Sequence, residues 1–302
     1  MNMQVSKRSN ETKLLASLLS PGSCATLACI WEATAPKPGN VYRGADFDDV
    51  TYVDFLTSAA VVGPVLDQVG ERGVGATVYQ AIMATQQAVG TNTNLGMMLL
   101  MAPLAAVPSD QGLKEGFQAV LDSLTPEDSE LVYTAIREAK PGGLGKVETG
   151  DLNADDQPAM LLLEAMQLAT NRDLVARQFT NGFREVFLTA DYLAAGVQDG
   201  WCLSDAIVHA FLRLLAEFPD SLIARKCGQQ TADEVSLRAA TALSKGVPGE
   251  KEYDRAVREL DFWLRADGHR RNPGTSADLV AGGLFVILRD QRLNWPVAFY
   301  PS

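Results

Sequence analysis

The segment from Glu32 to Val41 places one lysine between two prolines, directly after a predicted helix. Pro36 and Pro38 fix the backbone angle φ and remove two amide donors, so they hold Lys37 on a stiff elbow. The cation of Lys37 and the nearby carboxylate of Glu32 suit the binding of a phosphorylated ligand. The alternative interpretation is a helix stop that carries a solvent-exposed lysine.

Three carboxylates follow this elbow and can serve as magnesium ligands. They are Asp46, Asp48 and Asp49, and Arg43 precedes them. Mg²⁺ is commonly held by one or two carboxylates together with water and substrate phosphates, so this acidic cluster beside a lysine suits a nucleotide-metal complex. The alternative role of Asp48 or Asp49 is to cap the next helix.

A turn of polar side chains, Thr91 to Gly96, precedes the apolar run from Met97 to Met101. Asn side chains offer a donor and an acceptor together, so Asn92 and Asn94 can recognise a base or a ribose hydroxyl. A capping turn between two helices explains the same residues without a ligand.

Two arginines precede a predicted helix start near the end of the chain. Arg270 and Arg271 are followed by Thr275 and Asp278, which have the spacing of a capping box. Free amides at a helix start bind phosphate, and arginines beside them add positive charge, so we predict an anion site here. In the alternative interpretation, Asp278 serves only as a capping acid.

A glycine-rich segment from Pro141 to Asp156 resembles a phosphate loop only superficially. The Walker spacing fails, because no glycine stands five residues before Gly145 and Val147 replaces the required Ser or Thr. A P-loop nucleotide hydrolase is therefore excluded. The segment from Gly142 to Asp156 is interpreted as either a lid over the substrate or a plain exposed loop.

The elements that must position these segments are predicted to be helices. Apolar residues recur at steps of three and four in a series of windows, and alternating strand patterns are confined to short stretches such as Trp295 to Tyr300. The windows are 14–35, 52–69, 76–89, 95–107, 132–139, 158–169, 183–197, 203–216, 232–243, 250–265 and 276–288. We predict an all-α fold, with a flexible tail over residues 1–10 and one large bundle-like catalytic domain over residues 11–302.

Composition narrows the classes of function. The chain has 302 residues and a formal charge of −11, which argues against nucleic acid and anionic membranes as partners. It shows neither a secretory signal nor a run of eighteen apolar residues, so a cytoplasmic location is predicted. Its four cysteines form no CxxC pair and it has only two histidines, so a zinc site of the usual spacing is not expected.

Four segments taken together resemble the triphosphoribosyl-dephospho-CoA synthase family, and the resemblance covers nearly the whole chain. They are the elbow from Glu32 to Val41, the turn from Asn92 to Gly96, the segment Asp220-Ser-Leu-Ile-Ala-Arg-Lys226 and the segment Asn272-Pro-Gly-Thr-Ser-Ala-Asp-Leu279. The resemblance implies an all-helical enzyme that joins the ribose of ATP to the 2′-hydroxyl of dephospho-CoA and releases adenine. The implied product is a precursor of the prosthetic group of an acyl-carrier protein.

The implied reaction breaks an N-glycosidic bond through an oxocarbenium-like centre. It needs a carboxylate near the ribose, a base for the acceptor hydroxyl and cations on the triphosphate. We predict that Glu32 or Asp278 stabilises the positive charge or accepts the proton. The predicted binding residues are Lys37, Arg43, Arg225, Lys226, Arg270 or Arg271 for the triphosphate, Asn92 and Asn94 for the ribose, and Asp46 or Asp49 for Mg²⁺.

One departure from the family pattern bears on the substrate. Family members that serve citrate lyase usually have His-Lys where this chain has Asn94 and Leu95. Two groups able to bind phosphate or transfer a proton are thereby lost, which favours a divergent branch, for instance one that transfers a pentose phosphate to another cofactor precursor.

Two other hypotheses stay open at this point. One is a nucleotide N-glycosidase, in which water replaces the acceptor hydroxyl. The other is a non-catalytic helical nucleotide-binding or scaffold protein. The second would require Lys37, Arg225 and Arg271 to lie on separate surfaces.

Overall fold

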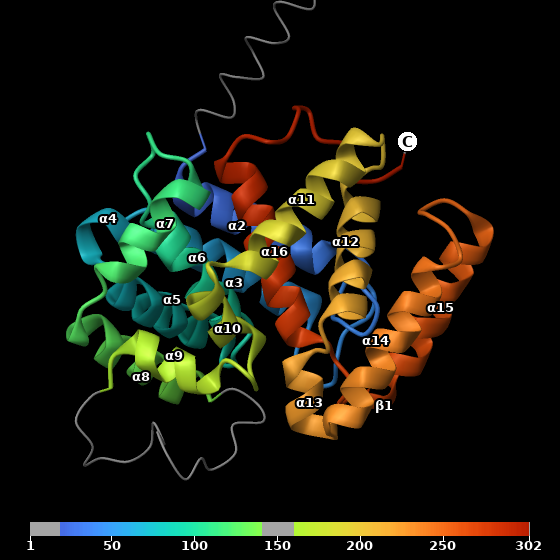
Figure 1. Cartoon of the computed structure of the whole chain (residues 1–302), viewed down its shortest axis with the longest axis horizontal. Helices are drawn as coiled ribbons and strands as arrows, with labels where there is room; N and C mark the ends of the chain where they lie inside the picture. Colours follow the sequence, from blue (N-terminus) through green and yellow to red (C-terminus); the bar gives the residue numbers. More distant parts are fainter. Residues whose placement is uncertain (1–18, 141–159, 302) are drawn as a thin grey trace, which may run out of the picture.

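The computed structural model describes residues 19–140 and 160–301 (Figure 1). Within these ranges the chain forms 15 helices and one short strand, and no sheet, which confirms the predicted all-α fold. The elements are α2 (Pro21–Thr34), α3 (Tyr52–Leu66), α4 (Val69–Arg72), α5 (Val74–Val89), α6 (Leu95–Ala105), α7 (Leu113–Asp122), α8 (Pro126–Ala139), α9 (Leu162–Ala169), α10 (Leu174–Asn181), α11 (Arg184–Gln198), α12 (Leu203–Glu217), α13 (Ser221–Cys227), α14 (Gln229–Leu243), α15 (Lys251–Arg265), β1 (Ala266–His269) and α16 (Gly274–Arg289). The predicted tail over residues 1–10 and the predicted lid or loop over residues 142–156 lie outside the described ranges.

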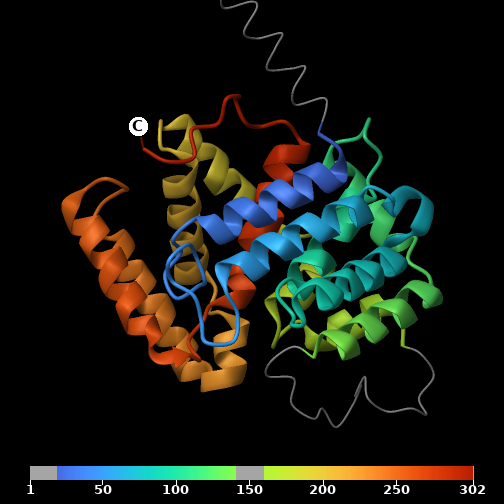
Figure 2. The ribbon, with the colours of Figure 1, turned by 180° about the vertical axis from the view of Figure 1, so that it is seen from behind.

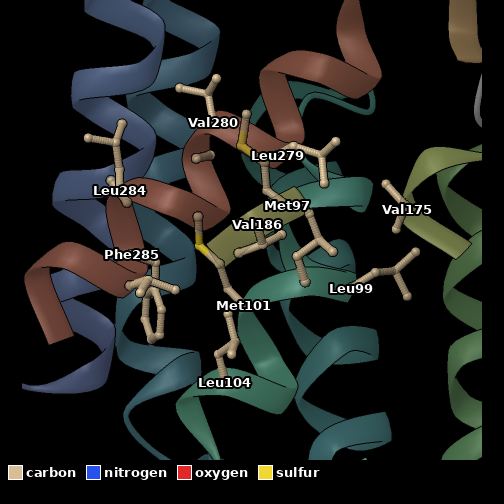
Figure 3. Close-up of a cluster of buried hydrophobic side chains, with 14 of the residues drawn as sticks. Met97, Leu99, Met101, Leu104, Val175, Val186, Leu279, Val280, Leu284 and Phe285 are labelled. Atoms are coloured by element: carbon tan, nitrogen blue, oxygen red, sulfur yellow. The ribbon is translucent and has the colours of Figure 1, made fainter. Parts of the chain in front are cut away.

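Helices α6 and α16 form the centre of the molecule. Nearly every side chain of α6 is buried, and so is nearly every side chain of α16 over residues 275–288. A helix that is apolar on all sides must lie inside protein. Figure 3 shows Met97 of α6, Val186 of α11 and Leu279 of α16 in one cluster of buried side chains. The central position of α16 matters because Asp278 lies near the start of this helix.

Close packing against α11 fixes the position of α16. Gly282 and Gly283 face this contact, and a Cβ atom at Gly283 would lie 2.9 Å from Thr189 Cγ2 and 3.1 Å from Ala190 N. Two glycines without Cβ atoms therefore let the two helix backbones approach each other. Glycine normally weakens the interior of a helix, but Gly282 and Gly283 allow the close packing of α16 against α11.

Helices α14 and α15 lie at one edge of the molecule, as both views show (Figures 1 and 2). Helix α15 buries Tyr253, Leu260 and Leu264 on one side and carries charged residues elsewhere. One of these charged residues, Asp261, accepts a hydrogen bond of 2.7 Å from Gly39 N. The edge helix therefore anchors the elbow that follows α2.

The helical windows predicted from periodicity correspond to helices wherever the structure describes them. Helices α4, α7, α10 and α13 were not among those windows. Trp295 to Tyr300 forms no strand. This stretch instead supplies two carbonyl oxygens, of Ala298 and Phe299, that accept from the first amides of α12 at 2.9 and 3.0 Å. Within the described ranges, no helix is both long and apolar enough to cross a membrane.

Candidate active site

Lys37 folds back onto the helix that it follows. Helix α2 ends at Thr34 because the coming Pro36 excludes a helical conformation from the residue before it. Nζ of Lys37 lies 2.8 Å from Glu32 Oε1 and also donates to the carbonyl oxygens of Glu32 and Ala35. The exposed fractions of the two side chains are 0% for Lys37 and 3% for Glu32. The pair is a buried salt bridge at the end of α2, and the alternative of a solvent-exposed lysine is wrong.

The predicted contact between Lys37 and a triphosphate is also wrong for this structure. The ammonium group is enclosed by three oxygen atoms of the protein and has no exposed surface. A buried lysine needs such partners, because an unpaired charge inside protein is costly. The structure therefore gives Lys37 the role of counterion to Glu32.

Glu32 keeps one carboxylate oxygen free. Its Oε2 atom is buried and has no hydrogen-bond partner among the described residues. Burial raises the pKa of Glu32, and the Lys37 ammonium offsets part of that increase. The neighbouring Cys29 thiol is also buried, and its pKa is raised by burial and further by the charges of Glu32 and Asp278. Glu32 and Asp278, which lie far apart in the sequence, therefore share one region of the interior.

Asp278 lies near the start of α16, and its carboxylate lies against the start of α6. Its side chain is partly buried, and the described residues provide it with no hydrogen bond. The backbone of Gly96 lies directly against its carboxylate, because a Cβ atom at Gly96 would overlap Oδ2 and lie 2.5 Å from Cγ. The glycine of the polar turn thus leaves the space that the Asp278 carboxylate occupies.

Four carboxylates gather around this point, and we call Glu32, Asp173, Asp220 and Asp278 the carboxylate cluster. Burial raises the pKa of Asp278 well above its usual value, and the charges of Glu32, Asp220 and Asp173 raise it further. The Arg225 guanidinium acts in the opposite direction. Asp278 therefore holds a proton more tightly than an ordinary aspartate does.

The start of α16 is capped by Asp220, not by the predicted capping box. The amide and the hydroxyl of Ser276 donate to Asp220 Oδ2 at 2.7 and 2.8 Å. Thr275 is bound to Ser221 instead, with 3.1 Å between the two hydroxyl oxygens. Asp278 makes no capping bond, so its interpretation as a capping acid is wrong. The predicted anion site on free amides at this helix start is also wrong, because an internal carboxylate already occupies it.

Arg225 connects the carboxylate cluster to the surface. Its Nη1 atom lies 2.5 Å from Asp173 Oδ2, and its buried Nε atom has no partner among the described residues. The other oxygen of Asp173 caps α10 by accepting from Val175 N and Ala176 N. The guanidinium is 23% exposed, so one cation of the predicted set lies beside the cluster and within reach of solvent.

Three further cations come from two segments that lie next to each other, and we call Lys226, Arg270 and Arg271 the basic rim. Nη2 of Arg270 lies 3.5 Å from the carbonyl oxygen of Lys226, although 43 or more residues separate the segments. Asp267 is a distant partner of both arginines, at 3.5 and 3.9 Å. Arg271 also stacks on Trp263, 4.4 Å from the ring centroid. Lys226 and Arg270 thus meet at one place, whereas Lys37 is buried against Glu32.

The polar turn before α6 is a structural turn. Asn92 Oδ1 accepts from the amides of Asn94 and Leu95 at 3.2 and 3.1 Å, and so it caps the helix. The side-chain amide nitrogen Nδ2 of Asn94 donates to Thr85 Oγ1 at 3.0 Å, and only 4% of the residue is exposed. The predicted ribose contact of Asn94 is therefore wrong for this structure, and Asn92 is committed to the backbone through its oxygen.

The burial of Asn94 and Leu95 changes the interpretation of their departure from the family pattern. Both residues are buried, and Asn94 is bonded to α5. Replacing His-Lys by Asn-Leu at these positions therefore alters contacts in the core. In this structure it does not remove a group from the carboxylate cluster.

The predicted magnesium ligands lie on the exposed loop between the elbow and α3. Asp46 Oδ1 accepts from Tyr52 N at 2.6 Å, and Asp49 Oδ2 lies 3.6 Å from His269 Nε2. Arg43 is exposed on the same loop. In the part of the chain that the structure describes, no group of three or more Asp, Glu, His or Cys side chains could hold a metal ion.

Neither Asp48 nor Asp49 caps α3. The cap is Thr51, which forms a reciprocal capping box with Asp54. The alternative interpretation of Asp48 or Asp49 as a helix cap is therefore wrong, although Asp46 of the same run accepts from Tyr52 N, the first amide of α3.

Sequence reasoning assigned no role to Asp173, Asp220 or Gly96. A signal existed for the two acids, since each directly precedes a predicted or observed helix start and Asp is a favoured N-cap residue. Nothing in the sequence showed that both caps would face Asp278. That relation depends on the packing of α10, α13 and α16.

Two comparisons with known proteins bear on the family of the chain. A family described as ATP:dephospho-CoA triphosphoribosyl transferase matches residues 19–297 of the chain. A crystal structure of a candidate triphosphoribosyl-dephospho-CoA synthase from Archaeoglobus fulgidus is 29% identical, with a TM-score of 0.62. The match covers 78% of this chain and 98% of that protein. No curated protein matches the chain significantly. Since the family match spans most of the chain, this protein belongs to the ATP:dephospho-CoA triphosphoribosyl transferase family.

Proposed function

We propose that the chain joins the triphosphoribosyl group of ATP to the 2′-hydroxyl of dephospho-CoA, with Asp278 as the proton acceptor. The observation that supports this most strongly is the state of Asp278. It is a carboxylate without a hydrogen bond among the described residues, set against Gly96 and surrounded by three other carboxylates. Such a group is poised to take a proton.

Glu32 and Asp278 differ in a way that assigns them separate roles. Glu32 has a lysine as a direct partner, which favours its charged form, whereas no cation within the described ranges bonds to Asp278. When two carboxylates in one site have pKa values that are pushed apart, one acts as the acid or base and the other stays charged. We assign proton transfer to Asp278 and the stabilisation of positive charge on the ribose to Glu32, whose buried carboxylate would act through its charge and not by direct contact.

The proposed step balances as follows. The bond between C1′ of the ATP ribose and N9 of adenine breaks, and its electron pair leaves with adenine. The 2′-oxygen of dephospho-CoA forms a bond to C1′ and gives its proton to Asp278. Adenine takes up a proton as it leaves, so the net reaction moves one proton from the hydroxyl to adenine. Positive charge develops on the ribose as the bond to adenine breaks, before the new bond to oxygen is complete.

The cations at the edge of the cluster are proposed to bind the triphosphate. Arg225 lies next to Asp173, and the basic rim of Lys226, Arg270 and Arg271 follows it toward the surface. Guanidinium groups bind phosphate in a planar, bidentate manner, which suits this role. Arg43 on the exposed loop is proposed to add to the same charge.

ATP is proposed to enter as its magnesium complex. Asp46 and Asp49 are exposed carboxylates, and Mg²⁺ readily combines one or two such groups with water and phosphate oxygens. Held there, Mg²⁺ would neutralise part of the triphosphate charge. We further propose that the product becomes the prosthetic-group precursor of an acyl-carrier protein.

Adenine release tests the proposed function. The purified protein is incubated with ATP and Mg²⁺, with and without dephospho-CoA, and adenine and the coupled product are followed by chromatography and mass spectrometry. The proposal predicts adenine and a triphosphoribosyl adduct only when dephospho-CoA is present. Adenine without dephospho-CoA would indicate an N-glycosidase, and no adenine in either mixture would contradict the transferase assignment.

A further inference from the structure

Asp220 is fully buried and bonds to two helices at once. Its Oδ1 atom accepts from Leu222 N and Ile223 N at 2.9 and 3.0 Å, which caps α13. Its Oδ2 atom accepts from Ser276 N and Ser276 Oγ at 2.7 and 2.8 Å, which caps α16. One carboxylate therefore closes the start of both helices, and its exposed fraction is 0%.

The second cap lies two residues before Asp278. Helix α16 begins at Gly274, so Ser276 lies in its first turn and Asp278 directly follows that turn. A helix start that is tied down at Ser276 has little freedom to rotate or fray. The direction of the Asp278 side chain then depends on the bond between Asp220 and Ser276.

We propose that Asp220 is a positioning residue for the transferase reaction, because it ties the first turn of α16 to α13 and so holds the Asp278 carboxylate against Gly96. The inference rests on the proposed function, in which Asp278 accepts the proton. Asp220 itself uses both oxygens for backbone and serine donors, so it acts through Asp278 and not on the substrate.

Charge gives Asp220 a second effect on the same group. The groups that face Asp278 are Glu32 and Cys29 from α2, Asp220 and Arg225 from α13, and Asp173 at the start of α10. Helix α6 contributes the uncharged Gly96. Among these groups the negative charge of Asp220 raises the pKa of Asp278, second only to Glu32 among the charged neighbours. Removing that charge should lower the pH at which Asp278 becomes a base.

Asp220→Asn tests both effects, because it keeps the shape and removes the charge and one acceptor oxygen. We expect kcat to fall about 10- to 100-fold, since a small displacement of a reacting group can cost about 100-fold in rate. The KM for ATP should stay within about threefold, because Asp220 touches no substrate, whereas a misplaced acceptor affects mainly the chemical step. The acid limb of the pH profile of kcat should move to lower pH. An unchanged kcat, or a reduced kcat with an unchanged pH profile, would overturn the proposal.

Asp128→Asn is the matched control. Asp128 also ties two helices, since its Oδ1 accepts from Gly75 N at 2.8 Å and its Oδ2 from Thr125 N at 2.9 Å. Asp128 contacts the first turn of α5, and Asn94 follows the other end of that helix. Helix α5 has 16 residues and is about 24 Å long. This variant should lose stability but keep the pH profile of kcat.

A readout without turnover separates this inference from the proposed function. The ¹³Cγ signal of Asp278, assigned by its absence in Asp278→Asn, is titrated by NMR in the wild type and in Asp220→Asn. A lower midpoint in the variant supports the link between the two residues even if the wild type releases no adenine, which would overturn only the proposed function. An equal midpoint in an active enzyme overturns the role of Asp220.

Ser276→Ala keeps the proposal testable if Asp220→Asn does not fold. It removes one of the four hydrogen bonds of Asp220 and leaves the rest of both helix starts intact. A smaller loss of kcat in the same direction, with KM unchanged, is expected. An unchanged kcat in this variant would count against the positioning role.

Discussion

The carboxylate cluster and the basic rim use charge in opposite ways. In the cluster, Glu32 and Asp220 are almost completely buried, and Glu32 is paired with the buried Lys37. In the rim, Arg270 is 62% exposed and its closest acidic partner lies at 3.5 Å. A buried charge acts strongly because little water screens it, whereas an exposed charge is screened by solvent and salt. We therefore expect the cluster to govern the chemical step and the rim to govern the binding of the triphosphate.

The strongest test of this difference between cluster and rim is to remove the proposed proton acceptor, Asp278. Asp278→Asn should reduce kcat by about 10²- to 10⁴-fold, the range expected for a lost general base. The KM for ATP should change little, because the residue is placed at the acceptor hydroxyl. Steady-state adenine release, measured beside circular dichroism of the folded variant, checks this expectation. Near wild-type kcat in the variant would remove Asp278 from the mechanism.

The same substitution should stabilise the protein at neutral pH. Below about pH 3, Asp278 is protonated in both the folded and the unfolded chain, so the two states do not differ. At higher pH the unfolded chain ionises more readily, because the pKa of Asp278 is raised in the folded state. The folded state thus loses stability as pH rises toward that raised pKa, and Asp278→Asn removes the loss. Urea unfolding at several pH values should show a gain that grows with pH; a constant difference would contradict the raised pKa.

Breaking the buried salt bridge between Lys37 and Glu32 tests how strongly a buried charge depends on its partner. Lys37→Met leaves the Glu32 charge without its partner and should destabilise the fold by about 3–5 kcal/mol, as expected when one member of a buried pair is removed. The double variant Glu32→Gln, Lys37→Met should recover part of that loss, because no charge then remains buried. Urea midpoints of the single and double variants measure the coupling. Additive losses would show that the two residues do not depend on each other.

Gly96→Ala tests the space in front of Asp278. The added methyl group would overlap the carboxylate, so Asp278 must move and kcat should fall by about tenfold or more. Gly70→Ala is the matched control, because nothing lies within 4 Å of its Cβ position. Kinetics of both variants, with stability measured in parallel, separate displacement of Asp278 from a general cost of the substitution. Equal kcat values for the two variants would refute the contact.

The smallest effects are expected at the basic rim. Arg270→Ala and Arg271→Ala should each raise the KM for ATP by about tenfold, the size expected for one charge-assisted hydrogen bond. Their kcat should stay near the wild-type value, and the effect should shrink at high salt. Arg255→Ala provides a control, since Arg255 is an exposed arginine paired with Glu259 on α15. A loss of kcat without a change in KM would place the rim in the chemical step instead.

Much of the fold could be predicted from the sequence because the signals are local. The apolar periodicity located the long helices, and Pro36 marked the end of α2 within two residues. Short helices such as α4 and α13 escaped, because four to seven residues carry too little periodicity.

The site was harder to predict, since it depends on which side chains meet. The sequence suggested Glu32, Arg225 and Asp278 by residue type and motif. It did not show that Lys37 turns inward to Glu32, that Asn94 turns to Thr85, or that Asp220 caps a helix 56 residues away. Each of these outcomes is a tertiary hydrogen bond to a group that is distant or unremarkable in the sequence.

The pH dependence of kcat for adenine release tests the central claim most directly. In the wild type, kcat should rise with pH through one ionisation that lies above the usual range of an aspartate, because Asp278 must lose its proton before it can act as the base. The residual activity of Asp278→Asn should lack that inflection. The same inflection in both proteins would show that another group accepts the proton, and would contradict the account.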